Sequence, residues 1–167
     1  IELEQKNHQI TIKNNNRCDF LRKDMEINIH YHYKQLDSII LKGYGNVNNN
    51  GKINHSIFIN AKDALCSINL KLNNDSNKII IQNGSTDINL SGNCSYFYFY
   101  NEGFAPLKAF ELEAKKTHIH SNSISNSEIN VTEQLNAEIR NNGNIYYKGT
   151  PTIIQTTNSG NGRLIPQ

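Results

Sequence analysis

Apolar and polar residues alternate along most of this chain in short runs. A period of two is typical of β-strands that bury one face and expose the other. No apolar stripe at helical spacing persists for three turns, and Ala109–Lys116 is the segment most compatible with a helix. The sequence therefore predicts an all-β protein with helix content near zero. The clearest alternating runs are Glu26–Lys34, Ile68–Leu72, Ile88–Leu90, Phe110–Ala114 and Leu135–Ile139.

The predicted strands repeat at a nearly constant period. A small or polar turn followed by an aliphatic anchor recurs seven times, in steps of 21, 20, 19, 22, 16 and 19 residues, and a second strand lies between successive anchors. An antiparallel sandwich would more usually show turns every 8–12 residues. We therefore predict a right-handed β-solenoid of about seven coils of roughly 20 residues, with insertions at some corners. The anchors are Val47, Ile68, Ile88, Leu107, Ile129, Ile145 and Leu164; the second strands are centred near Phe58, Ile80, Tyr98, Ile119, Ala137 and Ile154.

Asparagine is the most unusual component of the composition. The chain has 28 Asn against ten Gly and three Pro. Asn tolerates the left-handed backbone conformation and hydrogen-bonds its own backbone, so repeated Asn indicates many tight turns. In a stack of coils, Asn side chains at equivalent positions can also hydrogen-bond to one another as ladders.

The length of 167 residues fits one domain with its own core. We predict a single solenoid domain over residues 1–167, in which 1–35 form an N-terminal cap with the first strands and 36–167 form the repeating coils. The end of the chain near Pro166 shows no obvious cap. The two ends of such a stack are open strand edges, which favour pairing with other chains.

Charge and cysteine content exclude several classes of protein. The formal net charge is +2, with no run of five like charges and no arginine cluster, so nucleic acid is not an expected partner. Cys18, Cys66 and Cys94 show no metal-site spacing, and Cys66 and Cys94 are predicted to be core or half-buried thiols. No apolar run of 18 residues occurs, so we expect no transmembrane segment. Because the sequence opens at Ile1, we expect that an export signal or lipoprotein leader was removed.

A recognisable pattern of turns lies in the C-terminal part of the chain. It consists of Ile129-Asn130-Val131, Leu135, Gly143-Asn144-Ile145-Tyr146-Tyr147-Lys148-Gly149-Thr150-Pro151 and Gly160-Asn161-Gly162. Upstream it is joined by Ile88-Asn89-Leu90-Ser91-Gly92, Gly43-Tyr44-Gly45, and Ile10-Thr11-Ile12 with Cys18.

This pattern resembles the head-GIN-domain family of putative auto-transporter adhesins, exported proteins common in Bacteroidetes, over the whole chain. The chain departs from the family where Asn replaces turn glycines, as at Ser123–Ser127 and Asn141-Asn142-Gly143. The resemblance implies a β-solenoid fold and a cell-envelope location, in the periplasm or at the outer membrane or cell surface, with lipid anchoring through the leader as one route. It implies no catalytic residues and no cofactor.

Five consecutive aromatic residues, Tyr96–Tyr100, form the most distinctive local feature. Phe97 and Phe99 are the easier set to bury because they carry no hydroxyl that needs a partner. Tyr96, Tyr98 and Tyr100 should then face outward and form a candidate binding surface. Three interpretations remain open: a neighbouring loop such as Glu102–Leu107 covers the row, the row is an oligomer interface, or it binds a glycan or another ligand.

Other polar clusters are weaker candidates. The pairs His30/His32 and His118/His120 each place two imidazoles on one face of a strand, but two ligands do not make a metal site, and solvent-facing side chains are the simpler interpretation. Acidic residues could pair across coils as in solenoid polysaccharide lyases and hydrolases, yet they show no constant phase against the repeat. They are Asp63, Asp75, Asp87, Glu102, Glu111 and Glu113.

Three functional hypotheses follow. The first is a non-enzymatic envelope protein, an adhesin or surface-interaction module that contacts a glycan or a cell-surface protein. The second is a polysaccharide-active enzyme on a solenoid scaffold, which would need two carboxylates within about 10 Å in a groove. The third is a structural envelope component that forms homo-oligomers through strand edges or the tyrosine row.

Overall fold

The structure is a computed structural model that describes residues 1–14 and 27–167, and it divides into two compact units, residues 1–33 and 34–167. In the first unit, β1 (Glu2–Lys6) and β2 (Gln9–Lys13) pair as an antiparallel hairpin, with Asn7 in the turn at φ 55°. Cys18 lies outside the described residues. The capping role of residues 1–35 stays a prediction.

The strand predicted over Glu26–Lys34 is wrong for the residues that the structure describes, since residues 27–34 form no strand. The apolar side chains of this segment are exposed, for example Ile29 at 51% and Tyr31 at 48%. Alternation alone does not make a strand, because an extended segment needs a hydrogen-bonding neighbour and a surface on which to bury one face. His30 and His32 are exposed on the same segment.

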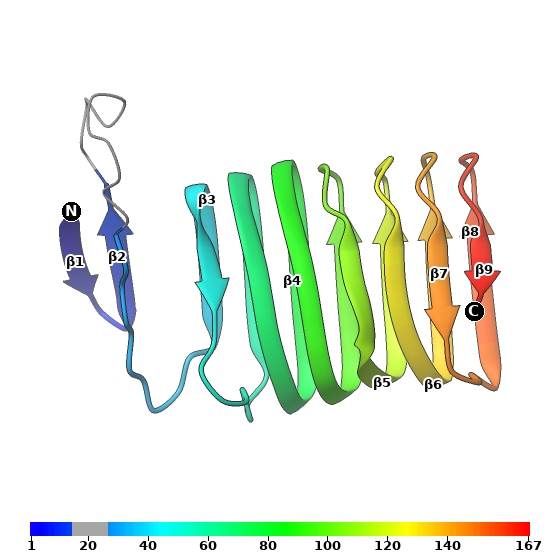
Figure 1. The fold of residues 1–167 in the computed structure, drawn as a ribbon, viewed down its shortest axis with the longest axis horizontal. Coiled ribbons are helices and arrows are strands. Elements are labelled where there is room, and N and C mark those ends of the chain that lie inside the picture. Colours follow the sequence, from blue (N-terminus) through cyan, green and yellow to red (C-terminus); the bar gives the residue numbers. More distant parts are fainter. Residues whose placement is uncertain (15–26) are drawn as a thin grey trace. The chain divides into compact units, whose positions relative to one another are not determined.

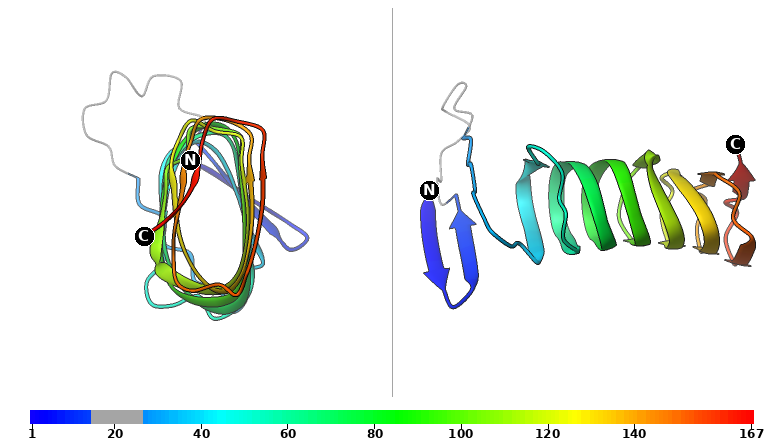
Figure 2. Two further views of the ribbon diagram at one scale, coloured as in Figure 1. Left: turned by 90° about the vertical axis from the view of Figure 1, so that its right-hand side faces the viewer. Right: turned by 90° about the horizontal axis from the view of Figure 1, so that it is seen from below.

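Residues 34–167 form a parallel β-solenoid of about seven turns (Figure 1), and seen along the stack its coils superimpose as a flattened oval (Figure 2). The prediction of an all-β solenoid is thus confirmed; the described residues contain no helix, and Ala109–Lys116 lies in a strand. Every pair of neighbouring strands is parallel, in the order β3-β4-β5-β6-β7-β9, with β8 paired to β6. The strands are β3 (Ser38–Asn48), β4 (Ile57–Asn101), β5 (Leu107–Ser121), β6 (Ser127–Ile139), β7 (Ile145–Lys148), β8 (Ile153–Asn158) and β9 (Leu164–Pro166).

The register of the coils corrects one predicted anchor. Leu107 pairs with Ser127, and Ser127 pairs with Ile145, whereas Ile129 pairs with Ala109. The steps in this part of the chain are therefore 20 and 18 residues instead of the predicted 22 and 16. Ser127 is completely buried. This residue does not fit a pattern of aliphatic anchors because it is small and polar.

The core lies inside the oval, between the two long walls of the solenoid. Its largest buried side chains include Phe97 and Phe99, whose rings stack with centroids 6.2 Å apart. At one corner the buried side chain of Asn101 is satisfied locally, because it donates to the carbonyl of Ala105 at 2.9 Å. Apolar burial at every coil is the main stabilising term of such a stack.

Asparagine ladders between coils are present as predicted. Asn69 donates through Nδ2 to Oδ1 of Asn48 at 2.9 Å, and Asn89 donates in the same way to Asn69 at 2.7 Å. We call Asn48, Asn69 and Asn89 the asparagine ladder. Another such bond joins Asn161 to Asn142 at 2.9 Å near the C-terminal end.

The two described cysteines match their prediction. Cys94 is buried and Cys66 is half-buried, and neither is in a disulfide. Burial raises the pKa of the Cys94 thiol to about 11. This thiol is therefore protonated at neutral pH and is a poor nucleophile.

Candidate functional site

The Tyr96–Tyr100 segment of β4 alternates as predicted. Phe97 and Phe99 are buried in the core, while Tyr96 is 39% exposed and Tyr98 and Tyr100 are half-buried on the outer surface. We call this outer surface, with the outward side chains of β5 and β6 beside it, the tyrosine face. From the loop Glu102–Leu107, Glu102 contacts the row by accepting a hydrogen bond from the Tyr100 hydroxyl at 3.0 Å.

One column of side chains crosses the tyrosine face from coil to coil. The Lys78 ammonium lies 5.7 Å from the centroid of the Phe58 ring and 5.2 Å from that of Tyr98. On the next coil, His118 packs edge-on against Tyr98 with ring centroids 5.3 Å apart. Both neighbours of Tyr98 in the stack thus contact its ring. These contacts hold the ring in place on the outer surface.

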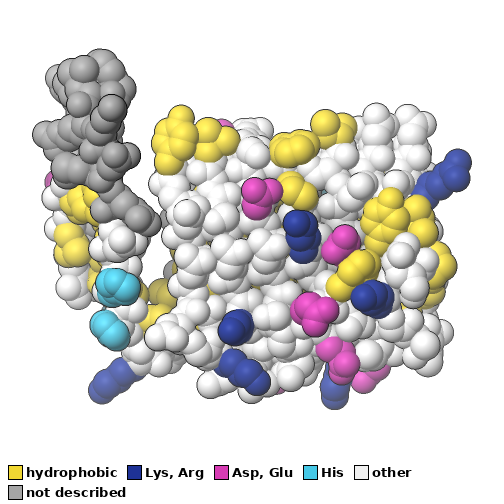
Figure 3. All heavy atoms as spheres, viewed as in Figure 1, with side chains coloured by type: hydrophobic (Ala, Val, Ile, Leu, Met, Phe, Trp, Pro, Cys, Tyr) yellow, Lys and Arg dark blue, Asp and Glu magenta, His cyan; other side chains and the backbone are white. Residues whose placement is uncertain are grey.

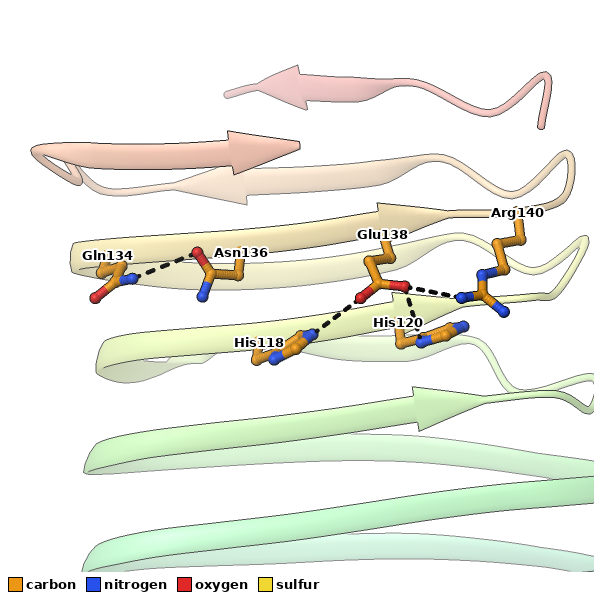
Figure 4. Close-up of polar contacts among 6 residues, drawn as sticks. All are labelled: His118, His120, Gln134, Asn136, Glu138 and Arg140. Carbon is orange, nitrogen blue, oxygen red and sulfur yellow. Dashed lines mark hydrogen bonds and ion pairs between the residues drawn. The ribbon is translucent and has the colours of Figure 1, made fainter. Parts of the chain in front are cut away.

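A second column on the same face contains titratable groups (Figure 4). The Tyr100 and His120 rings lie 4.8 Å apart. Glu138, on the following coil, approaches Nε2 of His118 at 3.5 Å and Nδ1 of His120 at 3.3 Å, and it accepts a hydrogen bond from Arg140 at 3.2 Å. His118 and His120 lie on the outer side of the strand, as predicted, but they are half-buried and are packed and paired across coils.

His120 should make the stability of the fold depend on pH. Burial lowers the pKa of this imidazole below its ordinary value of 6.5, with Arg140 and His118 acting in the same direction and Glu138 and Glu102 opposing it. The unfolded chain then binds a proton more readily than the folded one, so stability contributed at neutral pH is lost as pH falls below about 6.5. We expect a lower urea midpoint at pH 5 than at pH 7.5.

The matched variant for this prediction is His120→Gln, which keeps a polar side chain of similar size. The difference between the midpoints at the two pH values should shrink in the variant. An unchanged difference would assign the pH dependence to other groups.

The opposite broad face of the solenoid carries a shallow groove of about 520 Å³. It extends over six coils, from the asparagine ladder to Lys148 on β7. We call it the asparagine groove. In the space-filling view of this face, the surface over β4 is mostly uncharged and polar, while side chains of both charges gather over the later coils (Figure 3). Its lining residues are Asn48, Asn49, Asn69, Leu70, Lys71, Asn89, Leu90, Ser91, Lys108, Phe110, Glu111, Glu128 and Lys148.

Phe110 reaches this groove because of a β-bulge. The alternation predicted Phe110 on the same face as Leu112, but the pairing of β5 with β6 shifts register between Ala109 and Glu113. An extra residue in a strand reverses the alternation of the side chains that follow it. Ala109 and Leu112 are consequently both buried, while Phe110 is half-buried in the groove with Lys148 Nζ 4.4 Å from its ring centroid.

Acidic side chains line two hollows of the solenoid. Glu111 and Glu128 line the asparagine groove, and Asp75 and Glu113 line a smaller hollow beside Cys94. In the described part of the chain no group of three or more His, Cys, Asp or Glu side chains is arranged to hold a metal ion. The sequence did not single out Glu128 or the groove as a whole; the one available signal was Asn48, Asn69 and Asn89 recurring at the coil period.

The fold and the two patterned faces define a class: a parallel β-solenoid with flat outer surfaces and shallow grooves. Over residues 1–151 the sequence matches the family described as putative auto-transporter adhesin, head GIN domain. The chain belongs to this family, as its turn pattern predicted.

Solved structures and curated proteins give two further findings. The chain is similar to the crystal structure of a putative adhesin from Bacteroides fragilis, with a TM-score of 0.74 and 24% identity, over 79% of this chain and 61% of that one. A similarity at this identity shows the fold, and this chain spans less than two thirds of that protein. No curated protein matches the sequence.

None of the described residues belongs to a helix long and apolar enough to cross a membrane.

Proposed function

We propose that this chain is a non-enzymatic surface-interaction module of the cell envelope, an adhesin that contacts a glycan or a protein on another surface. Membership of the head-GIN-domain family is the observation that carries the proposal. An exported location, at the outer membrane or cell surface and with lipid anchoring through a leader, belongs to the same proposal.

The architecture supports this function in physical terms. Stacked coils hold side chains at strand spacing on a stiff scaffold, so a partner meets an extended, preorganised surface. The tyrosine face has the composition of a protein-binding surface, since Tyr and Arg are enriched where proteins meet. Tyr96, Tyr98 and Tyr100 are the proposed contact residues on this face. Tyr96 is the most accessible of the three.

The test is direct binding of the whole chain. Fluorescently labelled protein is titrated against a glycan array, immobilised extracellular-matrix proteins and intact cells. We expect saturable binding to at least one of these surfaces. Absence of binding to all of them at high micromolar concentration would contradict the adhesive function.

Catalysis is the alternative that a specific observation keeps open, because Glu111 and Glu128 line one groove. A polysaccharide hydrolase or lyase would release new reducing ends from its substrate, and Glu111→Gln would abolish that release. For a binding module we expect no release from any polysaccharide that the chain binds. Release by the wild type that Glu111→Gln abolishes would replace the adhesive proposal with an enzymatic one.

Self-association through the tyrosine row is the third possibility. Light scattering of the wild type and of Tyr98→Ser separates it from adhesion. An oligomer that Tyr98→Ser converts to a monomer would assign the tyrosine face to copies of this chain, whereas a wild-type monomer leaves the face for other partners.

A further inference from the structure

The asparagine groove combines two properties that a ligand-binding surface needs: fixed polar groups and unpaired charges. Each bond of the asparagine ladder uses one N–H of an amide and one lone pair of the next. Asn89 keeps its second N–H and its carbonyl oxygen, and Asn48 and Asn89 are exposed. The ladder thus orients both donors and acceptors toward solvent at a low entropic cost.

The charges of the groove disfavour a polyanionic ligand. The groove is lined by three lysines (Lys71, Lys108 and Lys148) and two glutamates (Glu111 and Glu128), so its local charge nearly cancels. Within the described residues, none of these five side chains takes part in an ion pair with another protein group. A nucleic acid or sulfated chain would meet two carboxylates here, whereas a neutral chain of hydroxyl groups can bond to the ammonium, carboxylate and amide groups alike.

The repeat of the groove matches a repeating ligand. Stacked coils advance about 4.8 Å each, so the six coils from Asn48 to Lys148 span about 24 Å. One sugar of an extended polysaccharide has about the length of one such step. A peptide strand is a poorer fit, because this surface is the face of a sheet and its backbone N–H and C=O groups are already paired between coils. Phe110 lies under the Lys148 ammonium, 4.4 Å from its ring centroid, and so holds this charge in the groove.

From these observations we infer that the asparagine groove binds a neutral polysaccharide that lies along the solenoid axis, with about one sugar for each coil. The inference rests on the proposed adhesive function and adds to it a second contact site, with its ligand class, on the face opposite the tyrosine row. The amides of Asn48 and Asn89 bond to hydroxyls two coils apart, and Asn69 between them orients both through the ladder, since it donates to Asn48 and Ser67 and accepts from Asn89. Lys108 and Glu128 continue the row on the next two coils.

The experiment measures calorimetric binding of neutral hexasaccharides, namely cellohexaose, laminarihexaose, xylohexaose, mannohexaose and chitohexaose, to the whole chain. We expect at least one to bind the wild type. The double variant Asn48→Ala/Asn89→Ala should bind it at least tenfold more weakly. The control is Asn142→Ala/Asn161→Ala, which also replaces two stacked asparagines, removes one Asn–Asn bond outside the groove and should bind like the wild type.

Thermal midpoints of both double variants establish that they fold. Lys108→Ala removes a single exposed side chain of the groove and provides a second groove variant that is independent of the ladder. Equal weakening in the control and the groove variant would overturn the inference. Weaker hexasaccharide binding by Tyr96→Ser, a variant on the opposite face, would also overturn the inference. The same holds if a heparin hexasaccharide binds more strongly than every neutral one. If the wild type binds cells or matrix proteins but no hexasaccharide, the inference fails while the adhesive function stands; if it binds nothing, the adhesive function itself fails.

Discussion

Replacing Gly84 by alanine should lower the free energy of unfolding by about 4 kcal/mol, a loss at the upper end for single substitutions. Gly84 has φ +76°, a conformation that side chains disfavour, and a Cβ there would lie 2.2 Å from the carbonyl oxygen of Ala64 on the preceding coil. The coils can accommodate that atom only by separating, which breaks ladder hydrogen bonds. Urea unfolding of the variant, followed by circular dichroism, measures the loss.

Gly43 offers a matched control on the same column. Its φ is +75°, it pairs with Ala64 from the other side, and a Cβ there would meet nothing within 4 Å. Gly43→Ala should therefore lower the free energy of unfolding only by the cost of the left-handed conformation, about 1–2 kcal/mol. Equal losses in the two variants would show that backbone conformation, and not the close approach of the coils, makes glycine necessary at position 84.

Phe99→Ala should destabilise the solenoid by about 3–5 kcal/mol, because it removes a completely buried aromatic side chain and leaves a cavity between the walls. The rings of Phe97 and Phe99 pack together, so neighbouring side chains can refill little of that volume. The urea midpoint should fall without a change in the slope of the transition.

The control lies one residue earlier on the same strand. Tyr98→Ser removes a half-buried ring from the outer surface and loses its contacts with Lys78 and His118, so we expect a loss of about 1 kcal/mol. If Tyr98→Ser destabilised the fold as much as Phe99→Ala, the outer columns would contribute to stability as the core does. The main role of the tyrosine face would then be to stabilise the fold, and not to bind a partner.

Much of the architecture could be read from local patterns. The alternation of Phe97 and Phe99 with Tyr96, Tyr98 and Tyr100 assigned inward and outward sides correctly. Most anchors were also correct, because large aliphatic side chains must recur wherever a coil crosses the core. The pattern failed at residues 27–34, where alternation continues without a neighbouring strand, and at Ser127, where a small buried hydroxyl stands in an anchor position.

The candidate sites depend on register to a much greater degree. His120 and Glu138 are 18 residues apart in the sequence, and Tyr100 and His120 are 20 apart. Each residue has an unremarkable local setting. A change of one residue in the length of a corner would separate these pairs and send their side chains to opposite faces. Sequence alone therefore indicated an outward tyrosine row but not the carboxylate and guanidinium beside it.

By itself, the sequence determined that this chain is a β-solenoid with an aromatic row on one wall, because a period of two within strands and a period near 20 between them follow directly from the order of the residues. Only the tertiary structure decided that Phe110 leaves the core at a bulge, that three asparagines join into a ladder, and that both line one groove with Glu128 and Lys148. The physical reason is that stacking register depends on the whole path of each coil, and one inserted residue reverses the direction of the side chains after it.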